Sequence, residues 1–549
     1  MNRRSPNRKQ SVLIPELVEE RIKRKPHAAR FFCYIAMYLD LPIYKPKIMG
    51  TPAYHRPTLV ALVLYAFFHG MFSAEDIHEF SQDNLGAIWI LGTMGLPSEK
   101  TIERVIHEML DQAESIFAKV FQLCDALGLV ARERLFIDGK KSKANASKHK
   151  AMSYGRLCDK IEKAEEKISE TKACLASTIE AFEDYTDEQL QEFISEQAKT
   201  LFKEKEAQHQ KGLDQRQQAI FAGQNPEPIT TTNSAVPLPF TELARTDLET
   251  LLDLGRIQFR LITMKNGKEQ LEKEWKITHG NKPIPDTKQI NFTDPESRIM
   301  VTKHQGVQQC YNHFVLVDDK ASIISGVHTS NSASDQTSFL PTMNHAETVL
   351  GNFAGIIVGG DAGFFSAQNQ LSAIEKGYTL WTPFPKPTDP FHKEKFVYKE
   401  DGDYYICPEN NSLKPVAHRP KTVRVTYKTS DCLNCPSQKK CTKARDGIRK
   451  IVRNREEDPI REQAKERAQS EEGKEVISQR KGVVEPVFGN MVTNDNLGQM
   501  HYRGLDKAGR EFFLRCIVHN LRKAFKAFCK SGQSQRYIME VAQSPPISA

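Results

Sequence analysis

The sequence predicts an α/β protein in which a core of alternating strands and helices carries an all-helical N-terminal domain, a long helical insertion and a small cysteine-containing insertion. Two short apolar runs each end in an aspartate, Asp138 or Asp361, as buried strands do where they enter a turn. The apolar period is helical over the first 130 residues and changes to an alternation of strands and helices between residues 298 and 384. A chain of 549 residues is long enough for several such units.

Residues 1–130 are predicted to form the helical N-terminal domain. Apolar residues between Leu59 and Ala66 recur on one helical face, and Ser73-Ala74-Glu75-Asp76 offers a cap to the following helix. A further helix is expected to begin near Pro97-Ser98. A compact helical unit of this size is compatible with DNA binding and equally with a plain helical scaffold.

Residues 131–156 are predicted to hold the first strand of the core, which ends at Asp138. Basic residues follow the aspartate closely and make the sharpest positive patch in the sequence: Lys140, Lys141, Lys143, Lys148 and Arg156. Contact with nucleic-acid phosphates is one interpretation of this patch, and a solvated loop is the other.

Residues 157–290 are predicted to form a helical insertion with a coiled-coil seam. Residues at heptad a and d spacing outline the seam: Ile161, Ala164, Ile168, Thr171, Leu175, Thr178 and Phe182. A second helix is expected after the capping box 186–189, and the Pro-, Thr- and Asn-rich residues 225–239 predict a linker before a third helix. Partner contact, guidance of DNA and a spacer without chemistry all remain open.

Residues 291–385 are predicted to complete the core. The expected strands are Tyr311–Val317, Ser322–Val327, Ile356–Asp361 and Tyr378–Thr382, and the expected helices are Asp335–Leu350 and Ala367–Lys376. Together with the strand that ends at Asp138, this order of elements matches a ribonuclease H-like core. In such a core the first and fourth strands are adjacent and present their aspartates at one edge of the sheet.

A third carboxylate, Glu485, lies in the helix-like segment Arg480–Gly489. Hard cations such as Mg²⁺ prefer oxygen ligands, and two of them about 4 Å apart can hold both the attacking and the leaving oxygen of a phosphodiester. Asp138, Asp361 and Glu485, in strand, strand and helix context, are therefore candidate catalytic residues that bind two Mg²⁺ or Mn²⁺ ions.

The residues around these acids resemble insertion-sequence transposases of the DDE type. The longest matching segment runs from Asp138 to Arg156. Shorter family-like blocks are spread along the chain: Tyr54-His55-Arg56-Pro57, Asp294-Pro295-Glu296-Ser297-Arg298, Gln309-Cys310-Tyr311-Asn312, Ser334-Asp335-Gln336, Asp361-Ala362-Gly363-Phe364-Phe365-Ser366, Val484-Glu485-Pro486-Val487-Phe488-Gly489, Arg503-Gly504-Leu505 and His519-Asn520-Leu521. The resemblance therefore spans most of the chain.

The resemblance implies that the three acids form a metal-binding triad and that Arg480 and Lys481 contact phosphates near the cleavage point. It further implies an enzyme that binds the terminal inverted repeats of its own mobile element, cuts the DNA there and joins it to target DNA without a covalent protein–DNA bond. Because two ends must be brought together, a homodimer or a larger synaptic complex is expected. Many relatives have tyrosine where Ile477 stands and lysine where Val492 stands, and these departures bear on how the DNA end is positioned.

Two other functions remain open at this point. A transposase-derived protein that binds the ends without productive transposition would account for Ile477 and Val492. A nuclease that cuts without joining would fit the same three acids. Metal-dependent nicking of an end-containing duplex tests the first, and detection of joined products tests the second.

Residues 386–474 are predicted to be the small insertion, which contains Cys407, Cys432, Cys435 and Cys441. The spacing of Cys432 and Cys435 is that of a zinc knuckle, and four thiolates suit tetrahedral Zn²⁺. Relatives carry a similar cluster, so the hypotheses are a structural zinc and free thiols packed in the insertion. The other seven cysteines are isolated and are predicted to be ordinary packed residues: Cys33, Cys124, Cys158, Cys174, Cys310, Cys516 and Cys529.

Residues 475–530 are predicted to hold the Glu485 helix and a last core helix, and residues 531–549 a tail. In the last helix Phe513, Ile517, Leu521, Ala524, Phe525 and Phe528 are expected to face the core, and Arg522, Lys523 and Lys526 to lie outside. His519 is predicted to be a packing residue rather than a catalytic one.

Charge, the length of apolar stretches and the number of cysteines limit the classes of protein to which this chain can belong. Lys and Arg outnumber Asp and Glu by 77 to 69, and the resulting net charge of +8 is compatible with nucleic-acid binding. No apolar stretch reaches the roughly 20 residues that span a bilayer, and the basic N-terminus is not followed by the apolar segment of a secretory signal. Eleven scattered cysteines favour reduced thiols. These features predict a cytoplasmic protein, and the resemblance to insertion-sequence transposases implies a bacterial one that associates with the nucleoid through DNA.

Overall fold

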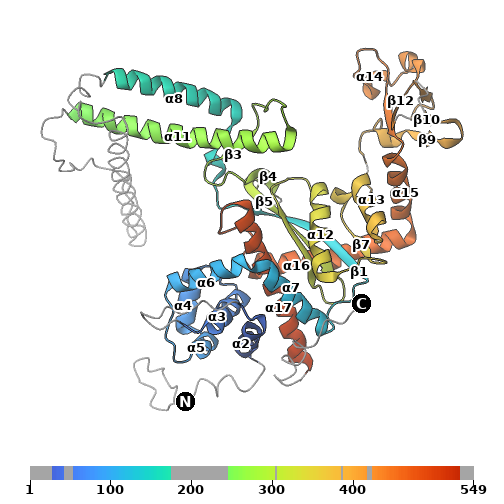
Figure 1. Cartoon of the computed structure of the whole chain (residues 1–549). Coiled ribbons are helices and arrows are strands. Elements are labelled where there is room, and N and C mark those ends of the chain that lie inside the picture. The colour runs from blue at the N-terminus through green and yellow to red at the C-terminus, as the bar shows by residue number, and fades with distance from the viewer. Residues whose placement is uncertain are drawn as a thin grey trace, which may run out of the picture. The chain divides into compact units, whose positions relative to one another are not determined.

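The computed structural model describes residues 27–41, 54–174, 245–302, 306–384, 387–416 and 423–531. The chain divides into two compact units, one made of residues 1–145 and 299–549 and the other of residues 146–298 (Figure 1). No helix in these described ranges is long and apolar enough to cross a membrane.

The N-terminal part of the larger unit is helical, as predicted. Its helices are α2 (Ala28–Leu39), α3 (Arg56–Phe68), α4 (Ala74–Asp83), α5 (Leu85–Leu91), α6 (Glu99–Asp111) and α7 (Ala113–Ala126). The expected cap is present, because the Ser73 hydroxyl accepts a hydrogen bond from Asp76 N over 3.0 Å and so satisfies an N–H that the first turn of α4 leaves free. Ser98 caps α6 in the same way. All residues from Leu59 to Phe67 are buried, which makes α3 the central helix of this group.

The last helix, α17 (Leu505–Ser531), packs against α7, α3 and α6. Phe513, Ile517, Leu521 and Phe528 are buried, which confirms the predicted core face. The prediction that Arg522 lies outside is wrong. Its guanidinium is 2.5 Å from the carboxylate of the fully buried Asp495, which requires a cationic partner.

The larger unit also contains a six-stranded sheet. Its strands are β1 (Arg134–Lys143), β4 (Arg298–Thr302), β5 (Gly306–Asp318), β6 (Ile324–Ser330), β7 (Ile357–Gly359) and β8 (Thr379–Trp381). The order is β4-β5-β1-β7-β8, and β6 also pairs with β5. The pairs β1–β5 and β5–β6 are antiparallel, whereas β1–β7 and β7–β8 are parallel.

The connections explain this mixture of directions. Parallel neighbours need a crossover, and here α12 (Phe339–Leu350) lies between β6 and β7, and α13 (Ala367–Lys376) between β7 and β8. Helix α12 packs so closely on β6 that a Cβ at Gly326 would lie 2.9 Å from Thr342 O. The bounds of α13 are those predicted from the sequence.

Two residues of α17 hold the edge of β6. Asn520 accepts a hydrogen bond from Ile324 N and donates one to Ile324 O, both over 2.9 Å, and so pairs with this strand as another strand would. The His519 Nε2 atom donates to Ser322 O over 2.9 Å. His519 is therefore a satisfied packing residue, as predicted, and this family-like block has a structural function.

The smaller unit contains a helix pair, α8 (Tyr154–Cys174) and α11 (Arg245–His279), and a short antiparallel pair of strands, β2 (Ala151–Ser153) and β3 (Gln289–Asn291). Leu157, Ile161, Leu271 and Ile290 form its core. On α8 the predicted seam residues Ile161, Ala164, Ile168 and Thr171 are less exposed than their neighbours. Leu175, Thr178, Phe182, the capping box 186–189, the linker 225–239 and the tail after residue 531 lie outside the described residues.

The cysteine-containing insertion folds as a second, five-stranded antiparallel sheet. Its strands are β9 (Val397–Lys399), β10 (Tyr404–Ile406), β11 (Ser412–Pro415), β12 (Arg424–Lys428) and β13 (Ile451–Asn454), in the order β13-β12-β11-β10-β9. One face of this sheet forms a core with Phe396, Leu413, Val425 and Tyr427. Two helices follow, α15 (Glu457–Gln469) and α16 (Glu471–Asn494).

Buried histidines make the stability of the larger unit depend on pH. Burial lowers the pKa of His313 to about 3 and the pKa values of His345 and His519 to about 4, from an ordinary value of 6.5. Because the unfolded chain then binds protons before the folded chain does, the free energy of unfolding is expected to fall as pH drops from 6.5 towards 4. The slope is about 1.4 kcal/mol per pH unit for each such histidine.

Urea unfolding at pH 7.5 and pH 5.0 measures this loss. His519→Gln is expected to reduce the difference between the free energies of unfolding at the two pH values. The control His107→Gln replaces a partly exposed histidine and should leave that difference unchanged. Equal pH dependence in all three proteins would contradict the explanation.

Candidate functional site

The two predicted aspartates follow the parallel pairing of β1 with β7. The prediction that the first strand ends at Asp138 is wrong, because β1 continues to Lys143 through its antiparallel pairing with β5. Phe136 of β1 is in register with Gly359 of β7, so that Asp138 and Asp361 each come two residues later along their own strands. Parallel strands run in the same direction, and the two residues therefore lie side by side where the pairing of β1 with β7 ends. Burial is the main cause that raises the pKa of Asp138, and the charge of Asp361 adds to the increase, in accordance with this proximity.

Asp138 has a cationic partner. Arg480 Nη1 on α16 lies 2.7 Å from Asp138 Oδ2, and both side chains are largely buried, with exposed fractions of 15% and 19%. Burial raises the pKa of Asp138, and Arg480 and the N–H of Gly139 offset part of that increase. A desolvated carboxylate with raised pKa is well suited to receive a further cation.

Asp361 lies in the turn after β7 and accepts a hydrogen bond from Gly363 N over 2.8 Å. Burial raises its pKa, and the charge of Asp335 raises it further. A Cβ at Gly363 would lie 3.0 Å from Asp361 Oδ1 and 3.1 Å from Asp335 Oδ2, so the two carboxylates border the same glycine. Asn312 of β5 holds Asp335 in place by donating to its Oδ1 atom over 2.8 Å.

Asp335 is the acidic residue that was not among the predicted site residues. Its signal was nevertheless available, because Ser334-Asp335-Gln336 and Gln309-Cys310-Tyr311-Asn312 are both family-like blocks. Neither block predicts that Asn312 and Asp335 would be in contact. That contact depends on how the loop after β6 folds over β5.

Glu485 is not brought to the two aspartates. It is exposed on α16, five residues after Arg480, and five residues of an α-helix correspond to a rotation of about 140°. The buried face of the helix consists of Val476, Val484, Val487, Phe488 and Met491. Among the residues that the structure describes, no group of three or more His, Cys, Asp or Glu side chains is placed to hold a metal ion.

The predicted basic residues fall into three places. Lys140, Lys141 and Lys143 are half-buried on β1, and Lys481 is exposed on α16 beside Arg480. Lys148 and Arg156 are exposed in the smaller unit. The two departures from the family pattern also lie on α16, where Ile477 is half-buried and Val492 is 40% exposed.

The chemistry of Asp138 and Asp361 fits hard divalent cations. Mg²⁺ and Mn²⁺ are bound by carboxylate oxygens, and two nearby desolvated carboxylates repel each other until a cation lies between them. Arg480 supplies part of that positive charge in this structure. The two aspartates are thus the candidate metal ligands that the structure brings together.

The four cysteines of the insertion surround one small cavity. Cys407, Cys432, Cys435 and Cys441 all line a space of about 20 Å³, together with apolar residues and Arg449. Burial raises the pKa of Cys441, and the other three cysteines raise it further while Arg449 opposes the increase. Asn411 N donates to Cys407 Sγ over 3.2 Å. The structure therefore brings these thiols around one cavity, without placing three of them as metal ligands.

Two models of protein families match the chain. The model described as Transposase domain (DUF772) matches residues 19–108, in the helical N-terminal part. The model described as Transposase DDE domain matches residues 406–525, which include the cysteines, Arg480 and Glu485 but neither Asp138 nor Asp361. No curated protein and no solved structure matches the chain.

Both matching models describe transposase domains. They support an insertion-sequence transposase of the DDE type and so confirm the resemblance predicted from the sequence. A DDE domain implies a metal-dependent enzyme of the polynucleotidyl transferase type, with DNA as its partner.

Proposed function

We propose that this protein cuts DNA at the ends of its own insertion sequence and joins those ends to target DNA, using a ribonuclease H-like core. The observation that carries the proposal is the position of Asp138 and Asp361, each two residues beyond the last parallel pair of β1 and β7, with a basic side chain beside Asp138. The strand order supports it as well. Along β6-β5-β1-β7-β8, three antiparallel strands are followed by two strands parallel to β1.

In this proposal Asp138 and Asp361 hold two Mg²⁺ or Mn²⁺ ions. Such ions lower the pKa of bound water and stabilise the charge on the departing 3′ oxygen. Burial of the two carboxylates lets them act on the ions with little competition from solvent. Glu485 is the proposed third ligand. Pro486 next to it removes a backbone hydrogen bond, so this turn of α16 is weaker than the rest of the helix.

The basic residues of the proposal contact DNA. Arg480 and Lys481 would bind phosphates near the cleavage point, and Arg480 exchanges its partner Asp138 for a phosphate when it does so. Lys140, Lys141, Lys143, Lys148 and Arg156 would bind the backbone farther along the DNA. Because two ends are joined in one reaction, we propose that the protein works as a homodimer or a larger synaptic complex.

A cleavage and strand-transfer assay tests this function. The substrate is a set of duplexes that carry the ends flanking the element, incubated with Mg²⁺ or Mn²⁺ and a target plasmid. Metal-dependent nicks at the ends followed by joined products are expected. Nicks without joined products would leave a simple nuclease, and binding without nicks in either metal would leave an end-binding protein without transposition.

We also propose that Cys407, Cys432, Cys435 and Cys441 bind one structural Zn²⁺. Four thiolates are a common ligand set for tetrahedral zinc, and all four line the same cavity. A zinc ion would also remove the mutual repulsion that raises the pKa of Cys441. The ion would stabilise the insertion and has no part in cutting DNA.

Metal analysis of the purified protein tests the zinc site. One zinc per chain is expected, with loss of the metal and a lower melting temperature in the variant Cys432→Ser/Cys435→Ser. The matched control is Cys529→Ser, which changes an exposed thiol on α17 and should keep the zinc. The opposite result would be a protein that contains no zinc after expression in zinc-supplemented medium and that melts at the same temperature as the double variant. That result would show that the thiols are merely packed together.

A further inference from the structure

The insertion sheet carries the excess positive charge of the whole chain. Residues 393–455 contain 16 Lys and Arg against 7 Asp and Glu, a net charge of +9, whereas the complete chain has a net charge of +8. The remaining residues therefore have 61 basic against 62 acidic side chains. A protein of near-neutral composition thus concentrates its net charge in one small domain, and such a concentration marks a surface for a polyanion.

The basic residues of the strands lie on one face. Side chains alternate across a strand, and Tyr405, Leu413, Val425 and Tyr427 occupy the core face. The opposite face presents four exposed cations, Lys399 of β9, Lys414 of β11, and Arg424 and Lys428 of β12. We call these four residues the basic sheet face. None of them forms an ion pair within the part of the chain that the structure describes.

Two of these cations face each other directly. Lys414 and Lys428 are in register across the antiparallel pair β11–β12. Like charges directly opposite one another destabilise a sheet. No acidic residue occurs in any of the five strands to relieve this repulsion. The arrangement therefore costs stability in the free protein, and an anionic partner would remove that cost.

The size of the face suits a nucleic-acid backbone. From β9 to β12 it crosses three strand spacings, roughly 15 Å in all. Phosphates repeat every 3.4 Å along each strand of duplex DNA, so several of them lie within that distance. Lysine and arginine side chains on a flat sheet reach phosphates without entering a groove, and such contacts carry no sequence information.

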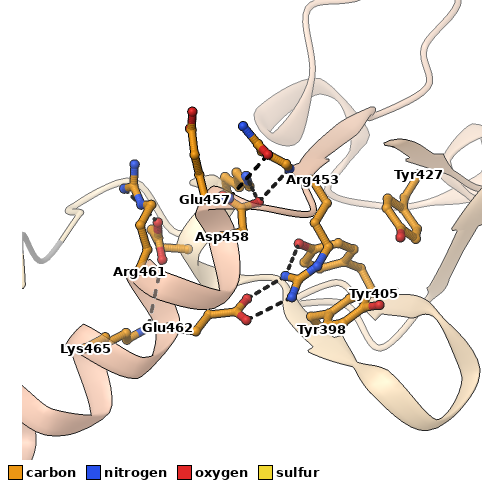
Figure 2. Close-up of polar contacts among 12 residues, drawn as sticks. Tyr398, Tyr405, Tyr427, Arg453, Glu457, Asp458, Arg461, Glu462 and Lys465 are labelled. Carbon is orange, nitrogen blue, oxygen red and sulfur yellow. Dashed lines mark hydrogen bonds and ion pairs between the residues drawn. The ribbon is translucent and has the colours of Figure 1, made fainter. Parts of the chain in front are cut away.

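The other face of the sheet is fixed to the helix that leads to the candidate active site. Figure 2 shows Arg453 of β13 with both guanidinium Nη atoms on Glu462 of α15, at 2.6 and 3.0 Å. The guanidinium also stacks over the ring of Tyr398 at 3.6 Å from the centroid and donates to the Tyr405 hydroxyl.

A second contact adds to this attachment. Asp458 of α15 accepts hydrogen bonds from Lys393 Nζ over 2.6 Å and from Asn454 N over 3.1 Å. Helix α15 is separated from α16, which carries Arg480, Lys481 and Glu485, by Ser470 alone. DNA held on the basic sheet face would therefore be connected to these residues through a rigid sheet–helix contact.

We propose that the basic sheet face binds the sugar-phosphate backbone of duplex DNA next to the cleavage point, independently of base sequence. This inference rests on the proposed function and assigns to the insertion sheet the contact that holds the DNA beside α16. Charge complementarity selects the occupant: four cations that form no ion pair with any described residue, and with no acid among them, match a uniformly negative duplex.

The test compares two pairs of substitutions that remove the same charge. Lys414→Gln/Lys428→Gln alters the basic sheet face, whereas Lys439→Gln/Lys440→Gln alters two exposed lysines of α14 (Gln438–Cys441) in the same insertion. Fluorescence anisotropy at several salt concentrations measures the affinity of each full-length protein for duplexes with and without the element's ends. The first variant is expected to bind both duplexes about tenfold more weakly and to show a salt slope smaller by about 2. The second should stay within about twofold of the wild type.

Three results would overturn the proposal: equal weakening by both pairs, no weakening by the first pair, or a weakening confined to the duplexes that carry the element's ends. A failure to fold is recognised separately. Because the first pair removes a like-charge contact, this variant should melt at the same temperature as the wild type or above it.

Binding is measured here without cleavage, so the two proposals can fail independently. A protein that binds through this face but never cuts would contradict only the proposed function. A protein that cuts and joins, with unchanged affinity in the first variant, would contradict only this inference.

Discussion

Asp361→Asn is expected to reduce cutting and joining of the element's ends by at least about 1,000-fold while leaving the affinity for DNA unchanged. The substitution keeps the size of the side chain and its ability to accept a hydrogen bond from Gly363 N, but it removes the negative charge that would hold a divalent cation. Single-turnover cleavage of end-containing duplexes measures the effect.

The same substitution should not weaken the fold. Burial and the charge of Asp335 raise the pKa of Asp361, so the folded protein holds the ionised carboxylate less favourably than the unfolded chain does. A folded pKa above the unfolded value means that this group lowers stability as pH rises through the folded pKa. Asparagine lacks that penalty, and the variant should melt at or above the wild-type temperature at pH 7.5.

Two controls make the result specific. Asp446→Asn changes an exposed aspartate that pairs with Lys450, outside the site, and should retain wild-type cleavage. Asp138→Asn should lose activity as Asp361→Asn does, although it also removes the ion-pair partner of Arg480. Normal cleavage by Asp361→Asn would remove this residue from the active site.

Arg515→Met is expected to destabilise the protein by about 3–5 kcal/mol, the typical cost of removing one partner from a buried ion pair. Arg515 is completely buried in α17 and its Nη1 atom lies 2.7 Å from Glu511. Its Nε–H donates to Asp495 O over 3.0 Å, and its guanidinium stacks on Phe72. Without Arg515, the carboxylate of Glu511 would remain buried with no cation in direct contact except His501 when that residue is protonated.

The pKa of Glu511 shows how strongly this site favours the charged form. Burial alone would raise it, but Arg515 and His501 lower it to about 2 from the ordinary 4.5. Because the folded pKa is depressed, the stabilisation is present above pH 4.5 and is lost as pH falls towards 2. Glu511 also accepts hydrogen bonds from His501 N and Tyr502 N and so fixes the turn between α16 and α17.

Urea unfolding at pH 7.5 measures the loss. A double variant, Arg515→Met/Glu511→Leu, removes both charges and should recover a large part of the lost stability, since the penalty lies in the unpaired carboxylate. The losses of unfolding free energy in the two single variants can be added and compared with the loss in the double variant. If the double variant loses more than this sum, the packing of Arg515 on Phe72 outweighs its charge.

Some of the site follows from local sequence. The apolar runs before Asp138 and Asp361 are recognisable as strands because a buried strand needs a continuous run of apolar residues, but the sequence did not predict that β1 continues to Lys143. The helix Ala367–Lys376 has a serine before it and a glycine after it, and both signals act within a few residues. The seam on α8 is equally local, since it depends only on residues three and four apart.

Other features were not predicted. The strands of the insertion sheet are only three to five residues long, so neither their length nor their period distinguishes them from turns. The grouping of Lys399, Lys414, Arg424 and Lys428 on one face depends on the register of those strands. The contact of Asp335 with the Asp361 turn, the ion pair of Arg522 with Asp495, and the pairing of Asn520 with β6 all join residues from different elements.

By itself, the sequence determined which residues could do chemistry and what kind: two aspartates that follow apolar runs, a glutamate on a helix, a knuckle of cysteines and an excess of positive charge. It also identified the transposase family that the comparisons support. Only the tertiary structure decided which of these residues meet. It brings Asp138 to Arg480, arranges the four thiols around one cavity and leaves Glu485 exposed on α16. The physical reason is that residue type and spacing act over one or two turns, whereas strand order, burial and desolvation depend on the whole packed chain.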